Sequence, residues 1–231
     1  MNKNIVKKKI NSADYHDYVI KDDVFIGDFE GMYRNSSGVP WHQDKTAYSI
    51  FTDIDLAILR NFYQEHRFNS ILELGCGLWY IAARLKYEFP KCKVTGVDIS
   101  PTAIKQAKKK FSGISFHVLD ILDTQASRFQ DKFDLVYVKD LLWYICHDMD
   151  NFINNLQEII KKGAFIYILQ SVPDLNKFYG QNLFPTCDSM ITFFSKRFRP
   201  LYSSSTYEKN SKRFMGKYAI DKYVRFLGQK V

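Results

Sequence analysis

The sequence predicts an α/β protein in which a mostly parallel sheet is covered by helices on both faces. From residue 69 onward, short apolar segments alternate with helical segments, which is the pattern of strand–helix–strand units. The chain has 231 residues, of which 46% are hydrophobic and 25% charged, as in an ordinary folded domain. Two glycines directly follow the first strand of this region, where a sheet of this class binds its ligand.

The alternating region contains the strands and helices of the predicted sheet. Five strands are expected, at residues 69–74, 93–98, 114–119, 133–138 and 164–170. Helices are expected between them, at residues 79–89, 101–110 and 149–162. Pro90 stops the first helix, Ser100 and Pro101 begin the second, and Gly163 is a normal residue to end the third.

The segments on either side of this region are less regular. Apolar spacing predicts a helix at residues 53–66, and the tail contains a predicted helix at 188–196. Two extended segments, at 201–207 and 218–226, would bring the sheet to seven strands. Residues 25–48 mix aromatic residues with turn formers, which indicates loops and a short helix. We therefore expect an N-terminal cap at 1–50 and a ligand-binding domain at 51–231.

Charge and cysteine content narrow the classes of partner and compartment. The net charge of +8 favours anionic partners, but the basic residues form no single block, so a nucleic-acid interface is disfavoured. None of the four cysteines forms a C-x-x-C pair, so we expect no metal site. The first 18 residues are polar, and no apolar run of membrane-spanning length occurs. These features predict a cytoplasmic protein without a membrane anchor, and they leave the oligomeric state open.

Three acidic or glycine-rich sites follow successive predicted strands. Glu73-Leu-Gly-Cys-Gly77 ends the first strand, where glycine allows a tight turn and close approach of a ligand. Asp98 ends the second strand, where a carboxylate can accept both hydroxyls of a ribose. Asp120 follows the third strand and could accept an adenine amine, while Ile121 offers its N–H and an apolar face. Together these residues predict an adenosine-containing ligand.

The glycine loop favours a ligand without a pyrophosphate. A dinucleotide fingerprint requires a third glycine three positions after the second, and Tyr80 stands there. S-adenosylmethionine (SAM) has no phosphate and carries a sulfonium cation instead. Of the two adenosine cofactors, SAM therefore agrees better with the sequence than NAD does.

The combination of motifs resembles that of class I SAM-dependent methyltransferases, over roughly residues 50–170. The other motifs that carry the resemblance are Val94-Thr-Gly-Val-Asp-Ile-Ser100, Leu119-Asp-Ile121 and Phe133-Asp-Leu-Val-Tyr137. The resemblance implies a Rossmann-like three-layer sandwich and SAM as cofactor, with S-adenosylhomocysteine (SAH) as product. It implies that Gly75 and Gly77 hold the methionine part, that Asp98 holds the ribose, and that Asp120 and Ile121 hold the adenine. Glu73 belongs to the glycine motif, and Cys76 and Ile99 are further cofactor-binding candidates.

The sequence departs from the family pattern beside the glycine loop. The family often has a third glycine two positions after the second, and here that residue is Trp79. After the fourth strand, the family segment that borders donor and acceptor corresponds to residues 138–145. Lys139 is expected to contact the cofactor through its backbone carbonyl. Asp140 and His147 are candidate catalytic residues, and His147 has a side chain suited to a general base near neutral pH.

The N-terminal cap resembles the segment that precedes the core in small-molecule methyltransferases, including nodulation-type N-methyltransferases. The resemblance rests on Phe29-Glu-Gly-Met-Tyr33 and Val39-Pro-Trp-His-Gln-Asp44. It implies that Tyr33, Trp41 and His42 lie near the mouth of the site, with His42 a further catalytic candidate. These residues could equally form a structural cap that packs on the domain.

The methyl acceptor is the least determined part of the prediction. The Asn/Asp-Pro-Pro-Tyr/Phe motif of enzymes that methylate base amines is absent after the fourth strand, where residues 139–142 read Lys-Asp-Leu-Leu. We expect transfer to an oxygen or nitrogen of a small polar or anionic metabolite, phosphorylated or sugar-linked. A weaker resemblance extends to methyltransferases of capsular polysaccharide clusters, including those of O-methyl phosphoramidate groups. An RNA methyltransferase and a non-catalytic SAM- or nucleotide-binding protein remain the alternatives.

Overall fold

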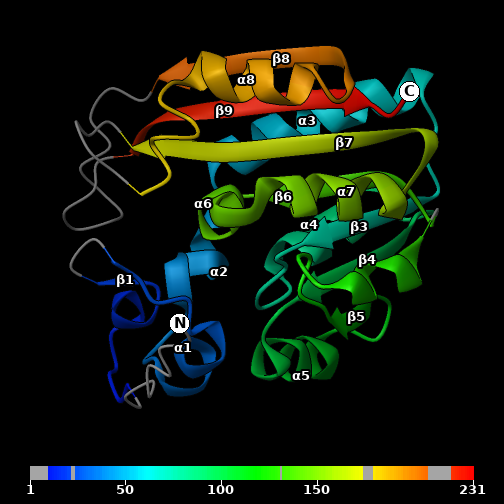
Figure 1. Cartoon of the computed structure of the whole chain (residues 1–231). Helices are drawn as coiled ribbons and strands as arrows, with labels where there is room; N and C mark the ends of the chain where they lie inside the picture. The colour runs from blue at the N-terminus through cyan, green and yellow to red at the C-terminus, as the bar shows by residue number, and fades with distance from the viewer. Residues whose placement is uncertain (1–9, 22–23, 131, 174–178, 208–219) are drawn as a thin grey trace.

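The computed structural model describes residues 10–21, 24–130, 132–173, 179–207 and 220–231. Its centre is a seven-stranded sheet with the order β5-β4-β3-β6-β7-β9-β8 (Figure 1). The first five strands in this order are parallel, while β9 pairs antiparallel with both β7 and β8. The predicted Rossmann-like architecture with seven mostly parallel strands is therefore confirmed.

The strands and helices of the domain have the following bounds. The sheet consists of β3 (Ser70–Leu74), β4 (Lys93–Asp98), β5 (Ser115–Val118), β6 (Phe133–Lys139), β7 (Ile160–Pro173), β8 (Arg199–Tyr207) and β9 (Ile220–Gln229). The helices are α3 (Ile50–Glu65), α4 (Tyr80–Glu88), α5 (Pro101–Lys110), α6 (Leu142–Ile145), α7 (Met149–Ile159) and α8 (Cys187–Ser195). Short 3-10 turns η3 (Thr124–Phe129) and η4 (Cys146–Asp148) complete the connections.

Two apolar cores fill the two sides of the sheet. One contains buried residues of α3, α4 and α5, among them Leu56, Leu85 and Ile104. The other contains buried residues of α7 and α8, such as Phe152 and Phe194. Because the strands are covered on both faces, their side chains read as continuous apolar runs and not as an alternating pattern.

The predicted helix over residues 149–162 was wrong at its C-terminal end. The helix stops at Ile159, and Ile160 already has extended backbone and pairs with Phe133 of β6. Gly163 has φ 76° but lies inside β7, where its N–H donates to the Lys230 carbonyl. The sequence misled because a glycine with positive φ serves an irregular strand as well as a helix end.

The N-terminal segment packs against the carboxyl edge of the sheet (Figure 1). It consists of η1 (Tyr15–Tyr18), a small hairpin of β1 (Ile20–Lys21) and β2 (Val24–Phe25), α1 (Phe29–Asn35), η2 (Pro40–His42) and α2 (Gln43–Thr46). Glu30 of α1 accepts hydrogen bonds from the Ser100 hydroxyl at 2.6 Å and from the Thr102 hydroxyl and N–H at 2.6 and 3.0 Å. A carboxylate at the start of α5 satisfies donors that the helix itself leaves free, and it ties the segment to the domain.

A fully buried ion pair joins α3 to the C-terminal hairpin. The Arg225 Nε of β9 donates to Asp55 Oδ1 at 2.7 Å, and neither side chain is exposed. The Tyr167 hydroxyl donates to the same carboxylate oxygen at 3.0 Å, and Arg225 Nη1 donates to Thr206 Oγ1 at 2.9 Å. Burial raises the pKa of Asp55, whereas the neighbouring cations Lys139 and Arg225 lower it. The partners on four elements thus fix how β8 and β9 join the sheet.

Within the described residues, no helix is both long and apolar enough to cross a membrane.

The buried ion pair predicts a large difference between two aspartates of α3. Asp55→Ala leaves Arg225 charged and unpaired inside the protein, so the free energy of unfolding should fall by about 3–5 kcal/mol. Asp53 pairs with Arg84 at 2.7 Å but is half exposed, so Asp53→Ala should cost less than about 1 kcal/mol. Urea denaturation measures the free energy of unfolding of both variants. Equal losses would mean that the buried pair stabilises the sheet no more than the surface pair does.

Candidate functional site

The glycine loop turns sharply at the carboxyl end of β3. Gly75 and Gly77 have φ angles of 72° and 50°, a region that side chains disfavour. The N–H groups of Gly75 and Cys76 both donate to the Val97 carbonyl of β4, at 2.8 and 2.9 Å. Cys76 is buried with its sulfur packed against Gly96, and burial raises the pKa of its thiol well above the usual range. The loop is therefore held by the neighbouring strand, and its thiol stays neutral.

Trp79 adopts the backbone conformation of the glycine that it replaces. Its φ angle is 81°, and it is the N-cap residue of α4. A non-glycine residue in this region carries a strain of about 1–2 kcal/mol. The indole packs near the rings of Tyr80 and Phe111, at centroid distances of 4.9 and 6.4 Å. A residue with left-handed backbone thus stands at the position where the family often has glycine, with two aromatic rings beside its indole.

The carboxylate of Asp98 joins the glycine loop to the start of α5. Its two oxygens accept the N–H groups of Gly77 at 2.8 Å and Ser100 at 2.9 Å. Only 7% of the residue is exposed. Burial raises the pKa of Asp98 to about 6, although the two N–H groups act in the opposite direction. A carboxylate with this pKa changes charge just below neutral pH.

Glu73 is a second buried carboxylate, one strand away from Asp98. Its Oε2 has no hydrogen-bond partner among the described residues, and only 3% of the residue is exposed. Burial raises the pKa of Glu73 well above its usual range, Asp98 raises it further, and Lys139 lowers it. A buried polar atom without a partner is costly, so its presence at a ligand site requires an explanation.

The N-terminal cap reaches the glycine loop through Gln43 and Tyr33. Gln43 Oε1 accepts the N–H of Leu78 at 2.9 Å, and Gln43 Nε2 donates to the Tyr33 hydroxyl at 2.9 Å. A Cβ on Gly77 would lie 2.5 Å from the Gln43 amide and 2.6 Å from the Tyr33 hydroxyl. Tyr33 was expected from the sequence, whereas Gln43 was not, because a lone glutamine in a loop forms part of no recognisable pattern. The cap therefore lies directly on the loop.

Aromatic rings connect the cap to the segment after β6. Trp41 lies near the rings of Phe29, Tyr33 and Tyr144, at centroid distances of 6.3, 6.3 and 5.8 Å. Tyr33 is buried, and this burial raises the pKa of its hydroxyl well above the usual range. Trp41 and His42 both have positive φ angles, 51° and 48°. Strained backbone of this kind clusters at ligand and active sites.

The end of β6 contributes Lys139 and Asp140. Asp140 has φ 51°, and its Oδ1 accepts the N–H of Ser171 at 2.8 Å. The Lys139 ammonium lies 3.8 Å from Asp140 Oδ2, and the lysine side chain is largely buried. Asp140 is thus held between β6 and β7 by a backbone donor. This arrangement assigns it a structural role beside the predicted catalytic one.

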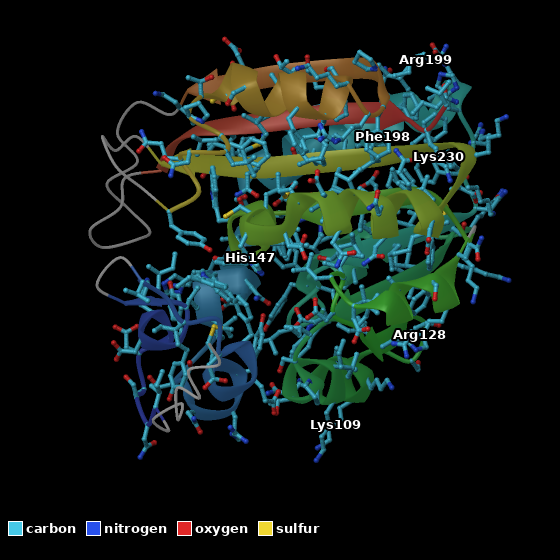
Figure 2. The ribbon with its side chains drawn as sticks, in the orientation of Figure 1. Lys109, Arg128, His147, Phe198, Arg199 and Lys230 are labelled. Atoms are coloured by element: carbon cyan, nitrogen blue, oxygen red, sulfur yellow. The ribbon has the colours of Figure 1, made fainter. Side chains whose placement is uncertain are left out.

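His147 lies on η4, facing the cap (Figure 2). The residue is exposed, and its ring lies 6.0 Å from that of Phe25. The structure therefore brings His147 to the cap side of the molecule, while His42 lies within the cap itself.

The end of β5 carries the residues predicted to hold the adenine. Asp120 Oδ1 accepts the N–H of Leu122 at 2.9 Å, which forms a tight turn. The Ile121 side chain is buried in the core, and its carbonyl accepts from Asn155 Nδ2 at 2.7 Å. Ile99, which follows Asp98, is 43% exposed. Of the two isoleucines, Ile99 is thus the one with a free apolar face.

Comparison with known families agrees with this geometry. A family model described as "Methyltransferase domain" matches residues 66–206, which is more than half of the chain. The chain belongs to this methyltransferase family. The match begins before β3 and ends in β8, so it contains the glycine loop, Asp98, Asp120 and Lys139.

Two curated relatives align with the central part of the chain. A malonyl-[acyl-carrier protein] O-methyltransferase of Bacillus cereus is 31% identical over 121 residues, which cover 52% of this chain and 39% of the relative. A putative methyltransferase, 235L, of invertebrate iridescent virus 6 is 26% identical and covers 57% of this chain and 49% of the relative. The chain thus spans less than half the length of either relative.

Solved structures share the fold at lower identity. The N-methyltransferase NodS of Bradyrhizobium japonicum matches with a TM-score of 0.56 and 20% identity, covering 78% of this chain and 95% of NodS. A protein solved in a study of disulfide-to-thioacetal conversion during echinomycin biosynthesis matches with a TM-score of 0.64 and 19% identity, covering 87% and 91% of the two chains. A Haemonchus contortus phosphoethanolamine N-methyltransferase with this fold was solved with SAM bound. These neighbours show that the domain shares the fold of methyltransferases, one of which was solved with SAM bound.

The tight contact at Gly77 yields a prediction for the folded protein. Gly77→Ala places a side chain at φ 50° and against Gln43 and Tyr33, so the protein should lose at least about 1–2 kcal/mol of stability. Gly113→Ala is the matched control, because nothing lies within 4 Å of its added Cβ. Thermal unfolding compares the two, and a stable Gly77→Ala variant would mean that the cap does not rest on the loop.

Proposed function

We propose that this protein transfers the methyl group of SAM to an oxygen or nitrogen of a small polar or anionic metabolite. The observation that carries the proposal is the arrangement around Gly77. Three features meet at the carboxyl edge of the parallel sheet. They are the left-handed glycine loop, the Asp98 carboxylate that accepts a loop N–H, and the buried Glu73 carboxylate. Ligands of open α/β sheets bind at this edge.

The residues of the loop fit SAM on two grounds. Glu73 Oε2 is a buried acceptor without a described partner, and the ammonium group of the methionine part is a donor that would satisfy it directly or through water. Asp98 matches the ribose, since a carboxylate accepts two adjacent hydroxyls. The exposed face of Ile99 and the turn at Asp120 would border the adenine.

In the proposed reaction, the protein aligns the acceptor and shields it from water. Bound SAM supplies a methyl group that is already activated by the sulfonium charge. Alignment of the reacting atoms can contribute on the order of 7–11 kcal/mol, so few catalytic side chains are required. Tyr33, Trp41 and Gln43 close the cap over the loop, and a closed cap excludes water. A hydroxyl acceptor would lose its proton to His42, His147 or Asp140, whereas an amine needs only to arrive unprotonated.

The cap must open for the methionine part to enter. Gln43 occupies the Leu78 N–H at the start of α4, where the carboxylate of the methionine part would find its donors. The same amide can then turn to contact the ligand. We propose Gln43 as a further cofactor-binding residue on this basis.

We infer the class of acceptor from the relatives of the chain and from its net charge. The Bacillus cereus relative is named as an O-methyltransferase, which favours an oxygen acceptor, and its carrier-linked malonyl substrate is one candidate class. The net charge of +8 agrees with an anionic acceptor. A role in capsular polysaccharide synthesis is proposed from the weaker resemblance of the sequence. A cytoplasmic location is proposed from the polar first 18 residues and the lack of an apolar run of membrane-spanning length. Methyl-transfer assays with sugar phosphates and with a malonyl thioester compare the two classes of acceptor.

Calorimetry with SAM, SAH and NAD tests the cofactor. Micromolar binding of SAM and SAH without binding of NAD supports the proposal. Binding of NAD alone would overturn it, because the loop would then serve a dinucleotide. Salt-sensitive binding of RNA would favour the RNA methyltransferase alternative, and SAM binding without turnover on any acceptor would favour a non-catalytic protein.

The raised pKa of Asp98 predicts that SAM affinity depends on pH. The ribose hydroxyls donate to the ionised carboxylate, so affinity should be highest well above the pKa of about 6 and weaken as the pH falls through it. Asp98→Asn should bind SAM about ten- to a hundredfold more weakly and lose this pH dependence. Titration calorimetry between pH 5 and 8 measures both effects. An unchanged dissociation constant in the variant would remove Asp98 from the cofactor site.

Substitution of a histidine that acts as the base should change the turnover of the enzyme but not its affinity for SAM. If the acceptor is a hydroxyl, His42→Ala or His147→Ala should lower kcat by about 10²–10⁴-fold while the dissociation constant of SAM stays the same. His66→Ala is the control. His66 lies at the end of α3 beside Phe165, near the amino end of β6 and so far from the carboxyl ends of the strands. Unchanged turnover in both variants would exclude these histidines as the base.

A further inference from the structure

The two edges of the sheet differ in how they are protected. At the β5 edge the strand has only four residues, and the Arg128 guanidinium donates to the Val118 carbonyl. Burial lowers the pKa of His117, and the nearby cations Lys108, Arg128 and Lys132 lower it further. Short length, charge and a covering side chain are the devices by which proteins prevent edge strands from pairing.

The β8 edge is longer and carries less charge, although Pro200 and an irregular register at Leu201 interrupt its first part. β8 has nine residues, and in the described part of the chain it pairs only with β9. Residues 200–206 contain no charged side chain. Leu201 and Tyr202 are 37% and 38% exposed, and Ser203 and Ser205 are exposed as well. Arg199, the one cation of the strand, stands at its first residue, at the corner of the molecule (Figure 2). Beyond Leu201, this uncharged part of the strand can offer backbone donors and acceptors to another strand.

We propose that two copies of this chain associate through their β8 edges, with the strands antiparallel about Ser204. The two seven-stranded sheets then continue into one another. The sequence around Ser204 is nearly symmetrical in chemistry, because Ser203 meets Ser205 of the second copy and Tyr202 meets Thr206. Each cross-strand pair brings together hydroxyl groups, which are favourable neighbours on a sheet.

Two arguments favour a second copy of this chain over other partners: the symmetry of the strand, and the closed assembly that pairing of like edges forms. Antiparallel pairing of like edges forms a closed twofold dimer. Pairing of β8 with the β5 edge of another copy would instead form an open chain of molecules, and Arg128 and the lysines around β5 oppose it. The Thr206 hydroxyl accepts from Arg225 Nη1 within the chain, so its own hydrogen is still available as a donor across the pair. The inference does not depend on the proposed function.

Sedimentation velocity of the full chain tests the dimer. The wild-type protein should sediment as a dimer at micromolar concentration. Ser203→Lys combined with Ser205→Lys places like charges opposite each other twice across the twofold axis, so the dimer should weaken about tenfold or more. Ser203→Glu combined with Ser205→Lys is the matched control, because the same positions then form opposite-charge pairs and the dimer should persist.

The outcomes separate pairing in this register from other associations. A mixture of the double-lysine variant with a double-glutamate variant at the same positions should restore a dimer. Far-UV circular dichroism confirms that each variant is folded. A wild-type protein that stays monomeric, or a double-lysine variant that dimerises as tightly as the wild type, would overturn the proposal.

Discussion

The candidate site depends on the two hydrogen bonds that the Asp98 carboxylate accepts. It accepts one N–H from the glycine loop and one from the residue before α5, so it joins these two loops directly. Glu30 of the cap binds the same start of α5 through Ser100 and Thr102. The cap, the glycine loop and the second strand–helix connection therefore meet around one pair of neighbouring carboxylates. Burial keeps this arrangement electrostatically strong, because little water screens it.

Backbone strain is concentrated around the same place. The non-glycine residues with positive φ among the described residues are Trp41, His42, Trp79 and Asp140, and all of them belong to the cap, the glycine loop or the end of β6. Each carries a cost that packing elsewhere must offset. The aromatic side chains of Phe29, Tyr33, Trp41 and Tyr144 provide this packing at the cap. An aromatic content that is high for a domain of this size thus serves the site as well as the core.

The C-terminal hairpin is secured in a different way. Arg225 and Asp55 form an ion pair without contact with solvent, and hydroxyl groups of Tyr167 and Thr206 complete its hydrogen bonds. A buried pair of this kind adds little net stability over an apolar contact, but only one register of β9 satisfies it. The pair therefore specifies the position of β8 and β9, and with it the exposed edge from which we infer a dimer.

The sequence by itself determined the order of strands and helices, the glycine loop, and the positions of Asp98 and Asp120 after their strands. These features depend on local patterns, since apolar runs, caps and glycines act within a few residues of one another. The end of α7 was misjudged because Gly163 has the same local signature inside a strand. Only the tertiary structure decided that Gln43 rests on Leu78, that Asp55 pairs with Arg225 and that Glu73 is left without a described partner. Such contacts join residues far apart in the chain, and no local pattern specifies which distant partner a buried polar group will find.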